Sequence, residues 1–440
     1  MRSPPPESAA PPRYTRNPFR SSGDKGPFQF PSYRAGNRPW RLCKRLADIE
    51  LAESGGAAPE RLGYIPRRRA RKAPALGRVP TLDFRLNEEQ QMLRDMVERF
   101  VQERFDPAVR PHHRIPAAGF DGGNWVLLAE LGLLALPLAE EDGGLAGGPV
   151  ELMVVAEALG RGVVAEPYLT EILFAGQLLA RAGTPAQKER FLANVAAGAV
   201  HIAVAHAEPA SRFALDDVET RFTDGRIDGT KTFIVAGAAT DAFIVTARGE
   251  DGTIGLYLVE AGAAGITRQD YRLIDGATAA QIGFAGTPAE PMAGDISILA
   301  ALIDELRVPI AAEMLGLMSA LFDTTLDYIR VRKQFGASIG SFQAIQHRMA
   351  DQYMAVEQSR SLLYRAALAE GEGAEAARIG AKAYIAEAGV RLAEEAIQLH
   401  GGMGITDELI VGHAYKRMLL LASLFGDPDT EIKRYAAAMR

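Results

Sequence analysis

RKQFGASIGSFQ, residues 332–343, and QLHGGMGITDE, residues 398–408, are the two stretches of this chain in which polar side chains and glycine are densest. Arg332 opens the first stretch, and arginine can hold a phosphate with two parallel hydrogen bonds. Gly401 and Gly402 would let the backbone approach a ligand closely, but they also suit the end of a helix. On physical chemistry alone, we favour the interpretation that both stretches are turns between helices.

Segments whose apolar residues have helical spacing lie next to both stretches. One runs from Ile385 to Leu399, where apolar residues recur at steps of three and four. Long helices with one apolar stripe pack together, so the sequence predicts a helical bundle over 296–440. A second stripe with the same spacing is formed by Phe342, Ile345, Met349, Tyr353 and Val356.

The chain upstream changes its period twice. Over 82–200 the apolar residues again have helical spacing, and Asn87 is suited to cap the first helix. From 201 to 294 short apolar runs alternate with turn signals, among them Asp224-Gly225, which predicts a β-hairpin. We therefore expect the order helical, β, helical. Further helices are predicted over 125–133, 149–160, 165–182 and 185–197.

Charge is distributed unevenly along the 440 residues, whose net charge is −6. Residues 1–80 hold 17 Lys and Arg against 6 Asp and Glu, whereas the remainder holds 32 against 49. An acidic body argues against nucleic acid as the main partner. No apolar run reaches the roughly 18 residues that a membrane helix needs. The single cysteine, Cys43, excludes an internal disulfide and suits a cytoplasmic protein.

Residues 1–80 also hold 13 of the 25 prolines and few aliphatic side chains. Such a segment cannot bury enough apolar area to offset its ordering entropy, so we expect a disordered, basic, Pro/Arg-rich extension. The arginine cluster at 67–72 also fits a nucleic-acid or membrane patch, or part of an organelle transit peptide. We favour a solvated extension among these interpretations.

Several common catalytic motifs do not occur in the sequence. There is no GxGxxG after a predicted strand, no GxxxxGK[ST], no HExxH and no GxSxG. These absences argue against Rossmann, P-loop, zinc-protease and serine-hydrolase sites. The 7 histidines show no spacing typical of metal ligands, so we expect no metal site.

The two quoted stretches and the helical, β, helical order resemble the acyl-CoA dehydrogenase family over residues 82–440. The resemblance implies an α+β, mostly α fold: an N-terminal helical bundle (81–200), a middle β-domain (201–295) and a C-terminal four-helix bundle (296–440). It implies FAD as cofactor and an acyl-CoA thioester as substrate, with a base removing the α-proton and the flavin accepting a hydride. It also implies assembly with a homologous subunit and an electron-transfer flavoprotein as electron acceptor.

In the family, the FAD site is shared between two subunits: one holds the flavin ring and its neighbour holds the nucleotide half. By position, the resemblance finds the residues that hold the nucleotide half in this chain. The flavin-ring side departs from the family pattern. Ala207 and Val235 stand where the family has hydroxyl side chains, and Phe233 stands for tryptophan. Each lost hydroxyl would need a backbone amide to replace it. Asp304 and Arg307 match positions that touch the CoA arm, although a solvated helix start explains them equally well. The nucleotide-side groups are Arg332, Phe335, Gln343, Gln398, Leu399, His400, Gly401 and Gly402.

The catalytic base also departs from the family pattern. Its two family positions are Phe425 and Leu306 here, and neither is acidic. Glu313 lies about two helical turns beyond Leu306 in an apolar stretch, so it is the candidate base. The alternative is that Glu313 is buried in an ion pair. Other nearby acids are Glu305 and Asp427.

The intact nucleotide side and the altered ring and base positions lead to three hypotheses. The chain is one subunit of a heteromeric acyl-CoA dehydrogenase whose partner supplies the base. Alternatively, it is a self-sufficient homo-oligomer that uses Glu313 or another relocated acid, or it is a redox-inactive subunit that binds CoA or assembles with partners. The grouping of the departures favours the first hypothesis.

Overall fold

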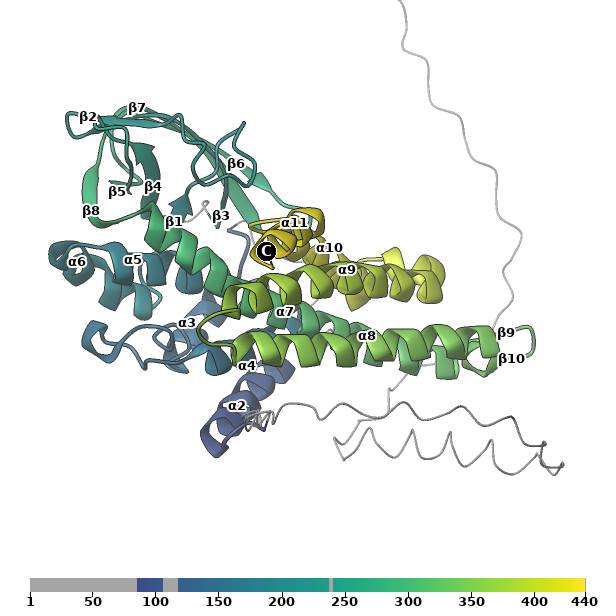
Figure 1. Ribbon diagram of the computed structural model, residues 1–440. Coiled ribbons are helices and arrows are strands. Elements are labelled where there is room, and N and C mark those ends of the chain that lie inside the picture. Colours follow the sequence, from purple (N-terminus) through teal and green to yellow (C-terminus); the bar gives the residue numbers. More distant parts are fainter. Residues whose placement is uncertain (1–84, 106–117, 237–239, 440) are drawn as a thin grey trace, which may run out of the picture. The chain divides into compact units, whose positions relative to one another are not determined.

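Figure 1 shows the computed structural model, which describes residues 85–105, 118–236 and 240–439. All of these belong to one compact unit, Pro80–Arg440. The extension expected over 1–80 lies outside the described residues. In the described part, helices are followed by strands and then by helices, as the sequence predicts. None of the helices in this part combines the length and hydrophobicity needed to span a membrane.

Helices form the first part of the fold. The predicted cap of the first helix is confirmed: Asn87 Oδ1 accepts a hydrogen bond from the Gln90 N–H at 2.8 Å. The helix predicted over 165–182 begins as a π-helix and continues as an α-helix. The elements are α2 (Glu88–Phe105), α3 (Gly122–Glu130), η1 (Glu140–Asp142), α4 (Pro149–Arg161), η2 (Tyr168–Gly176), α5 (Gln177–Ala182) and α6 (Pro185–Ala196).

A sheet follows, with strand order β6-β7-β3-β2-β4-β5-β8 and with β1 paired in parallel to β4. The predicted hairpin turn is confirmed, because Asp224 and Gly225 both have positive φ and join the antiparallel strands β2 and β3. The strands are β1 (Ile202–Ala205), β2 (Arg221–Thr223), β3 (Arg226–Val235), β4 (Ala242–Arg248), β5 (Ile254–Glu260), β6 (Ile266–Arg272), β7 (Thr278–Pro288) and β8 (Glu290–Asp295).

The last part is helical again and is centred on the long helix α7 (Ile296–Val331). A small hairpin of β9 (Lys333–Gln334) and β10 (Ala337–Ser338) follows α7 and leads to the next helix. The remaining elements are η4 (Ile339–Ser341), α8 (Gln343–Ala367), α9 (Ala374–His400), η5 (Gly401–Ile405), α10 (Ile410–Ser423) and α11 (Pro428–Ala438).

Two glycines allow α4 and α7 to pack closely. A Cβ atom on Gly160 would lie 2.1 Å from the Glu313 carbonyl oxygen, and one on Gly316 would lie 2.1 Å from the Glu157 carbonyl oxygen. Since real Cβ atoms do not approach this closely, alanine at either position would force the helices apart. The close contact joins the N-terminal helices to the C-terminal bundle.

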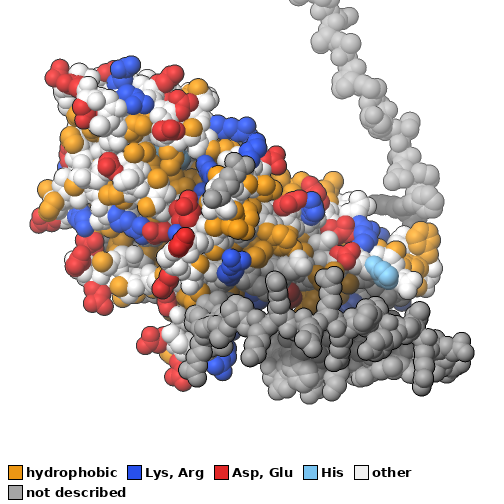
Figure 2. All heavy atoms as spheres, viewed as in Figure 1, with side chains coloured by type: hydrophobic (Ala, Val, Ile, Leu, Met, Phe, Trp, Pro, Cys, Tyr) orange, Lys and Arg blue, Asp and Glu red, His pale blue; other side chains and the backbone are white. Residues whose placement is uncertain are grey.

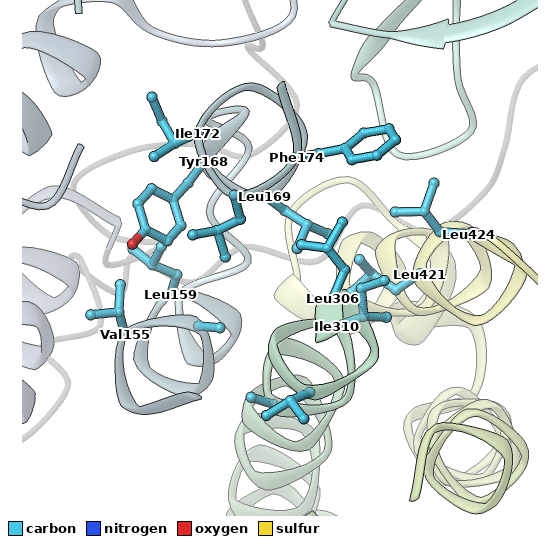
Figure 3. Packing of buried hydrophobic residues seen from close by; sticks show 14 of the residues in the cluster. Val155, Leu159, Tyr168, Leu169, Ile172, Phe174, Leu306, Ile310, Leu421 and Leu424 are labelled. Atoms are coloured by element: carbon cyan, nitrogen blue, oxygen red, sulfur yellow. The ribbon is translucent and has the colours of Figure 1, made fainter. Parts of the chain in front are cut away.

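The hydrophobic core continues across this junction. Figure 3 shows side chains of α4, η2, α7 and α10 packed against one another, with Phe174 directed toward the segment that holds Leu424. Burial of such side chains from four elements is the main contribution to holding the two helical parts together. It also fixes the position of Phe174 at the edge of the core.

The surface in Figure 2 differs between the sheet and the helices. Charged side chains of both signs are spread over the sheet, whereas hydrophobic side chains gather over the C-terminal helices. The apolar residues exposed there include Ile432 in α11 and Met354 in α8. Exposed apolar groups of this kind are typical of surfaces that contact another protein.

Candidate functional site

The first quoted stretch forms an exposed turn at the end of α7. Phe335 has a φ of 53° and Gly336 a φ of 82°, so these two residues reverse the chain between β9 and β10. The Phe335 side chain is 94% exposed. Arg332 and Gln343, on either side of the turn, are exposed as well. An aromatic ring held in solvent by a fixed turn suits a surface that a ligand or partner covers.

The second quoted stretch lies beside the first. The His400 ring stacks on Tyr328 with centroids 4.3 Å apart, and His400 Nδ1 contacts the Ala396 carbonyl oxygen at 2.8 Å. Leu399 belongs to the same small cluster as Ile329. The structure therefore brings the two stretches together. We call residues 332–343 and 398–402 the bundle-end region.

Within the second stretch the predicted residues fall into two groups. The side chains of Leu399 and His400 are buried, so only their backbone groups are available to a ligand. Gln398, Gly401 and Gly402 are exposed, and a Cβ atom on either glycine would meet no atom within 4 Å. Exposed polar groups next to open backbone fit the nucleotide half of a dinucleotide.

A separate cavity of about 430 Å³ lies between the sheet and the helices. Phe233, Val235, Asp304 and Arg307 line it, and no residue of the bundle-end region does. Its walls come from η2, β1, the loop 206–220, β3, the starts of α7 and α9, and the segment from Ser423 onward. The structure thus divides the predicted site residues between two places.

The two places are far apart on α7. Arg307 lies 25 residues before Arg332, which corresponds to about 37 Å along an α-helix. An extended FAD molecule is shorter than this separation. The cavity and the bundle-end region are therefore two separate places on this chain.

Two parts of the cavity wall differ in chemistry: we call the aromatic part formed by Phe174, His206 and Phe425 its inner end, and the charged part formed by Arg212, Asp304, Arg307 and Arg434 its outer end. The ring of Phe174 lies 4.8 Å from that of Phe425 and 5.6 Å from that of His206, and the His206 and Phe425 centroids are 5.8 Å apart. His206 Nδ1 is buried and has no hydrogen-bond partner among the described residues. Burial, and then the nearby ammonium of Lys231, lower the pKa of His206 to about 4. His206 is therefore neutral near pH 7.

The wall predicted for the flavin ring carries no side-chain hydroxyl at the expected positions. Ala207, Phe233 and Val235 all line the cavity. The Ala207 carbonyl accepts a hydrogen bond from the Thr232 N–H at 2.9 Å, so it is already occupied within the protein. Phe233 has a φ of 52°, a conformation that non-glycine residues rarely adopt. The side chains of these residues therefore provide no hydroxyl donor at the positions where the family has one.

Charged groups gather at the outer end of the cavity. Arg307 Nε bonds Glu431 Oε2 at 2.7 Å, and Arg307 Nη1 bonds Asp304 Oδ1 at 2.8 Å. Glu431 Oε1 also accepts a hydrogen bond from Arg434 Nη1 at 2.6 Å. Asp304 is held a second time by Arg378. The two residues predicted to touch the CoA arm are thus brought together, and each is engaged in an internal ion pair.

Glu313 lies elsewhere and is ion-paired. Its Oε1 accepts a hydrogen bond from Arg417 Nε at 2.7 Å, and Arg417 Nη1 bonds Asp275 Oδ2 at 3.0 Å. The flanking carboxylates raise the pKa of Arg417 even though burial opposes this. Glu313 does not line the large cavity. This arrangement matches the alternative of a buried ion pair, because a carboxylate fixed by arginine outside the cavity is not placed to remove a substrate proton.

The other acids considered from the sequence are also paired. Glu305 bonds Arg181 on the surface at 2.7 Å. Asp427 caps α11 through the Thr430 N–H at 2.8 Å and pairs with Arg212 at 2.7 Å. Hydrogen bonds from Thr430 and the Arg212 guanidinium lower the pKa of Asp427. None of these carboxylates faces the inner end of the cavity.

Sequence reasoning missed many of the residues that line the cavity, among them the basic side chains His206, Arg212 and Arg434. His206 directly precedes the Ala207-Glu208-Pro209 segment, so its position next to a predicted flavin contact was a usable signal. Arg212 and Arg434 carried no such signal, because their contacts join segments more than 200 residues apart in the chain.

Comparison with known proteins agrees with this architecture. The family model described as acyl-CoA dehydrogenase, N-terminal domain, matches residues 87–199, and the one described as acyl-CoA dehydrogenase, C-terminal domain, matches residues 296–440. The chain belongs to the acyl-CoA dehydrogenase family. Members of this family are FAD-dependent oxidoreductases of lipid metabolism that act on acyl-CoA thioesters, and FAD is the cofactor that family membership assigns to this chain.

The similarity to individual relatives covers most of the chain. The acyl-CoA dehydrogenase IpdE2 of Mycolicibacterium smegmatis is 30% identical over 355 residues, covering 80% of this chain and 99% of the relative. The probable acyl-CoA dehydrogenase YngJ of Bacillus subtilis is 29% identical over 381 residues, with 81% and 99% covered.

Two solved structures are similar along nearly their full length. The ChsE4-ChsE5 complex from Mycobacterium tuberculosis contains a chain that is 27% identical with a TM-score of 0.75, covering 81% of this chain and 99% of that one. A variant of the Tcur3481-Tcur3483 steroid ACAD contains a chain that is 26% identical with a TM-score of 0.72, covering 80% and 98%.

Proposed function

We propose that this chain is one subunit of a two-chain acyl-CoA dehydrogenase. In this proposal its bundle-end region holds the nucleotide half of FAD. A homologous partner seats the flavin ring and supplies the base that removes the α-proton. The observation that carries the proposal is the absence, among the described residues, of an acidic side chain at the inner end of the cavity.

The base positions support this division of labour. Phe425 occupies one position and contributes to the aromatic inner end, while Leu306 occupies the other and is buried in the core. The acids that line the cavity in the described part are Asp304, which is held by two arginines, and the exposed Glu375. Neither is a buried, unpaired carboxylate of the kind that could serve as a base beside a buried acyl chain.

The residues predicted to hold the nucleotide also support a subunit that binds FAD without seating its ring. Arg332 offers a planar guanidinium for the pyrophosphate, and Gly401 and Gly402 leave their backbone open to it. Gln343 and Gln398 add exposed hydrogen-bonding groups. Because the cavity of this chain is too distant, these groups fit an FAD whose ring lies in another subunit.

The proposed chemistry follows from the thioester. When bound, FAD would supply the hydride acceptor for Cβ that protein side chains lack. The α-proton requires a base in a dry site, and we assign that base to the partner. The residues of this chain then serve to bind and orient the nucleotide. We expect an electron-transfer flavoprotein to reoxidise the enzyme, as the family resemblance implies.

Two similar structures favour a partner whose sequence differs from that of this chain. The ChsE4-ChsE5 complex and the Tcur3481-Tcur3483 steroid ACAD are each described by two chain names. Both are similar to this chain over about four fifths of its length. A heteromer explains why one chain retains the nucleotide side while its ring and base positions differ from the family pattern.

A self-sufficient homo-oligomer is the second candidate, and His206 is the observation that favours it. A neutral imidazole lines the inner end and could accept a proton there, although a pKa of about 4 makes it a weak base. If Glu313 were the base instead, Glu313→Gln would abolish turnover of the isolated chain. We expect no such turnover to begin with.

Flavin content tests the proposal. The full chain is expressed alone and together with a homologous chain that has glutamate at the position matched by Phe425. We expect no bound flavin and no acyl-CoA oxidation by the chain alone, and one FAD per pair with activity after co-expression. One FAD per chain with activity in the isolated protein would reject the proposal. Flavin-free, inactive mixtures with each homologue would favour a redox-inactive subunit.

A further inference from the structure

Arg212 has an unusual conformation at the outer end of the cavity. It lies in the loop 206–220 between β1 and β2, and its φ of 47° is one that non-glycine residues rarely adopt. Such strain persists only where surrounding contacts fix the backbone, and it is common at ligand sites. Arg212 itself lines the cavity.

The loop around Arg212 is anchored on both sides. Glu208 accepts hydrogen bonds from the Glu219 and Thr220 N–H groups at 2.8 and 3.1 Å, which closes the base of the loop. On the other side, Arg434 of α11 donates to the Phe213 carbonyl at 3.2 Å. The backbone at Arg212 is therefore held in place by contacts that do not involve its own side chain.

The Arg212 side chain has one ion pair, with Asp427, which directly follows the cavity-lining segment Ser423–Phe425 and Gly426. Its Nη2 lies 2.7 Å from Asp427 Oδ2, and the guanidinium lies 5.3 Å from the ring centroid of Phe213. The side chain is 75% exposed, so this ion pair is well solvated and weak. Asp427 accepts the hydrogen bond from the Thr430 N–H through Oδ1, the carboxylate oxygen that Arg212 does not contact.

The other arginines of the cavity are less able to exchange partners. Arg307 and Arg434 share Glu431, whose side chain is only 1% exposed. Withdrawing either arginine would leave a buried carboxylate with an incomplete set of partners, which is strongly unfavourable. Arg212 is the one cavity arginine in the described part whose ion-pair partner is otherwise satisfied by a helix cap.

We propose that Arg212 is an exchangeable recognition residue for an anionic group of the ligand that enters this cavity. Arg212 pairs with Asp427 when the cavity is empty and with a phosphate of an acyl thioester of CoA when the cavity is filled. The aromatic inner end accepts the apolar acyl chain, and the outer end accepts its charged carrier. This inference rests on the proposed function in one respect: the thioester bound in this cavity is not oxidised by this chain.

Binding to the full chain tests the proposal without requiring turnover. Calorimetry with octanoyl-CoA is compared with calorimetry using S-octanoyl-N-acetylcysteamine, which has the thioester and no phosphate. The variants are Arg212→Gln, Asp427→Asn and the double variant. Asparagine caps helices about as well as aspartate, so Asp427→Asn removes the competing charge and keeps the cap. Arg391→Gln is the matched control, because Arg391 is 72% exposed, is paired with Glu387 and does not line the cavity.

If Arg212 exchanges Asp427 for a phosphate, the variants should show a specific pattern of affinities. Asp427→Asn should bind octanoyl-CoA about three-fold more tightly because a competing anion is gone. Arg212→Gln should bind it about ten-fold more weakly because a charge-assisted hydrogen bond to phosphate is lost. The double variant should match Arg212→Gln, and the phosphate-free thioester should be insensitive to both changes.

Other results would overturn the proposal. These are no octanoyl-CoA binding by the wild-type chain, equal binding by wild type and Arg212→Gln, or a gain from Asp427→Asn that persists without Arg212. Failure of the proposed function would look different. An isolated chain that contains FAD and oxidises octanoyl-CoA would reject the two-chain enzyme, whereas the affinity pattern of the Arg212 and Asp427 variants would still decide the role of Arg212.

Discussion

The bundle-end region and the cavity are built in opposite ways. The bundle-end region is rich in glycine and held by local turns, and its side chains Arg332, Gln343 and Gln398 are exposed. The cavity is lined by aromatic rings at its inner end and by interlocked ion pairs at its outer end. Changes in the first should therefore affect ligand binding and leave folding intact. Changes in the ion pairs of the second should affect folding first.

The largest expected effect comes from Glu431→Gln at the outer end of the cavity. Glu431 is almost completely buried between Arg307 and Arg434, and its neutralisation leaves Arg434 without its carboxylate and Arg307 with Asp304 alone. We expect the free energy of unfolding to fall by about 3–5 kcal/mol, measured by urea denaturation. The exposed Asp327→Asn, which breaks a surface pair with Arg330, should cost less than about 1 kcal/mol. Similar losses in both variants would show that the cavity network does not stabilise the fold.

Arg332→Gln should produce the opposite result in the bundle-end region. We expect the affinity of the two-chain enzyme for FAD to fall about 100-fold, because a bidentate contact to phosphate is lost. The free energy of unfolding of the flavin-free chain should change by less than about 0.5 kcal/mol, since Arg332 is exposed. Reconstitution with FAD, followed by fluorescence, measures the first quantity. Arg330→Gln, two residues earlier on the helix, is the control that should bind FAD normally.

The cavity should also make stability depend on pH through His206. Its pKa is about 4 in the folded chain and about 6.5 when unfolded, so between these values only the unfolded chain binds the proton. The free energy of unfolding should therefore decrease as pH falls from 7 to 5, by about 1–2 kcal/mol from this group. His206→Phe keeps an aromatic ring and removes the titration. Equal losses of stability in the wild type and in His206→Phe would rule out this contribution.

The smallest effect is expected from Phe425→Glu. This change places a carboxylate at the family base position of this chain, but the flavin ring is assigned to the partner. The turnover of the two-chain enzyme should stay within about two-fold of the wild-type value, measured with a saturating acyl-CoA. A large gain, or activity of the isolated variant, would mean that the cavity of this chain seats a flavin ring.

Local features were predictable from the sequence. Helical spacing predicted the long helices, Asn87 predicted a cap and Asp224-Gly225 predicted a hairpin turn, because each depends on residues that are close together in the chain. The exposed turn at Phe335 and the helix end at Gly401 follow from the same kind of signal. Both glycine-rich stretches are turns after helices, as physical chemistry alone indicated, and the family match adds the ligand that such turns can bind.

The interior of the cavity was not predictable in this way. Phe174, His206 and Phe425 meet although they lie in three distant segments, and no local pattern specifies that contact. The pairing of Glu313 with Arg417 spans 104 positions and decides whether the glutamate is structural. Long-range ion pairs depend on how the helices pack, which hydrophobic spacing alone does not determine.

Photoaffinity labelling of the two-chain enzyme tests the central claim most directly. Two FAD analogues are used, one with an azide on the adenine and one with an azide on the flavin ring. We predict that the adenine azide labels this chain within 332–343 or 398–402 and that the ring azide labels only the partner. Ring-azide labelling of residues 206–235 in this chain would contradict the account.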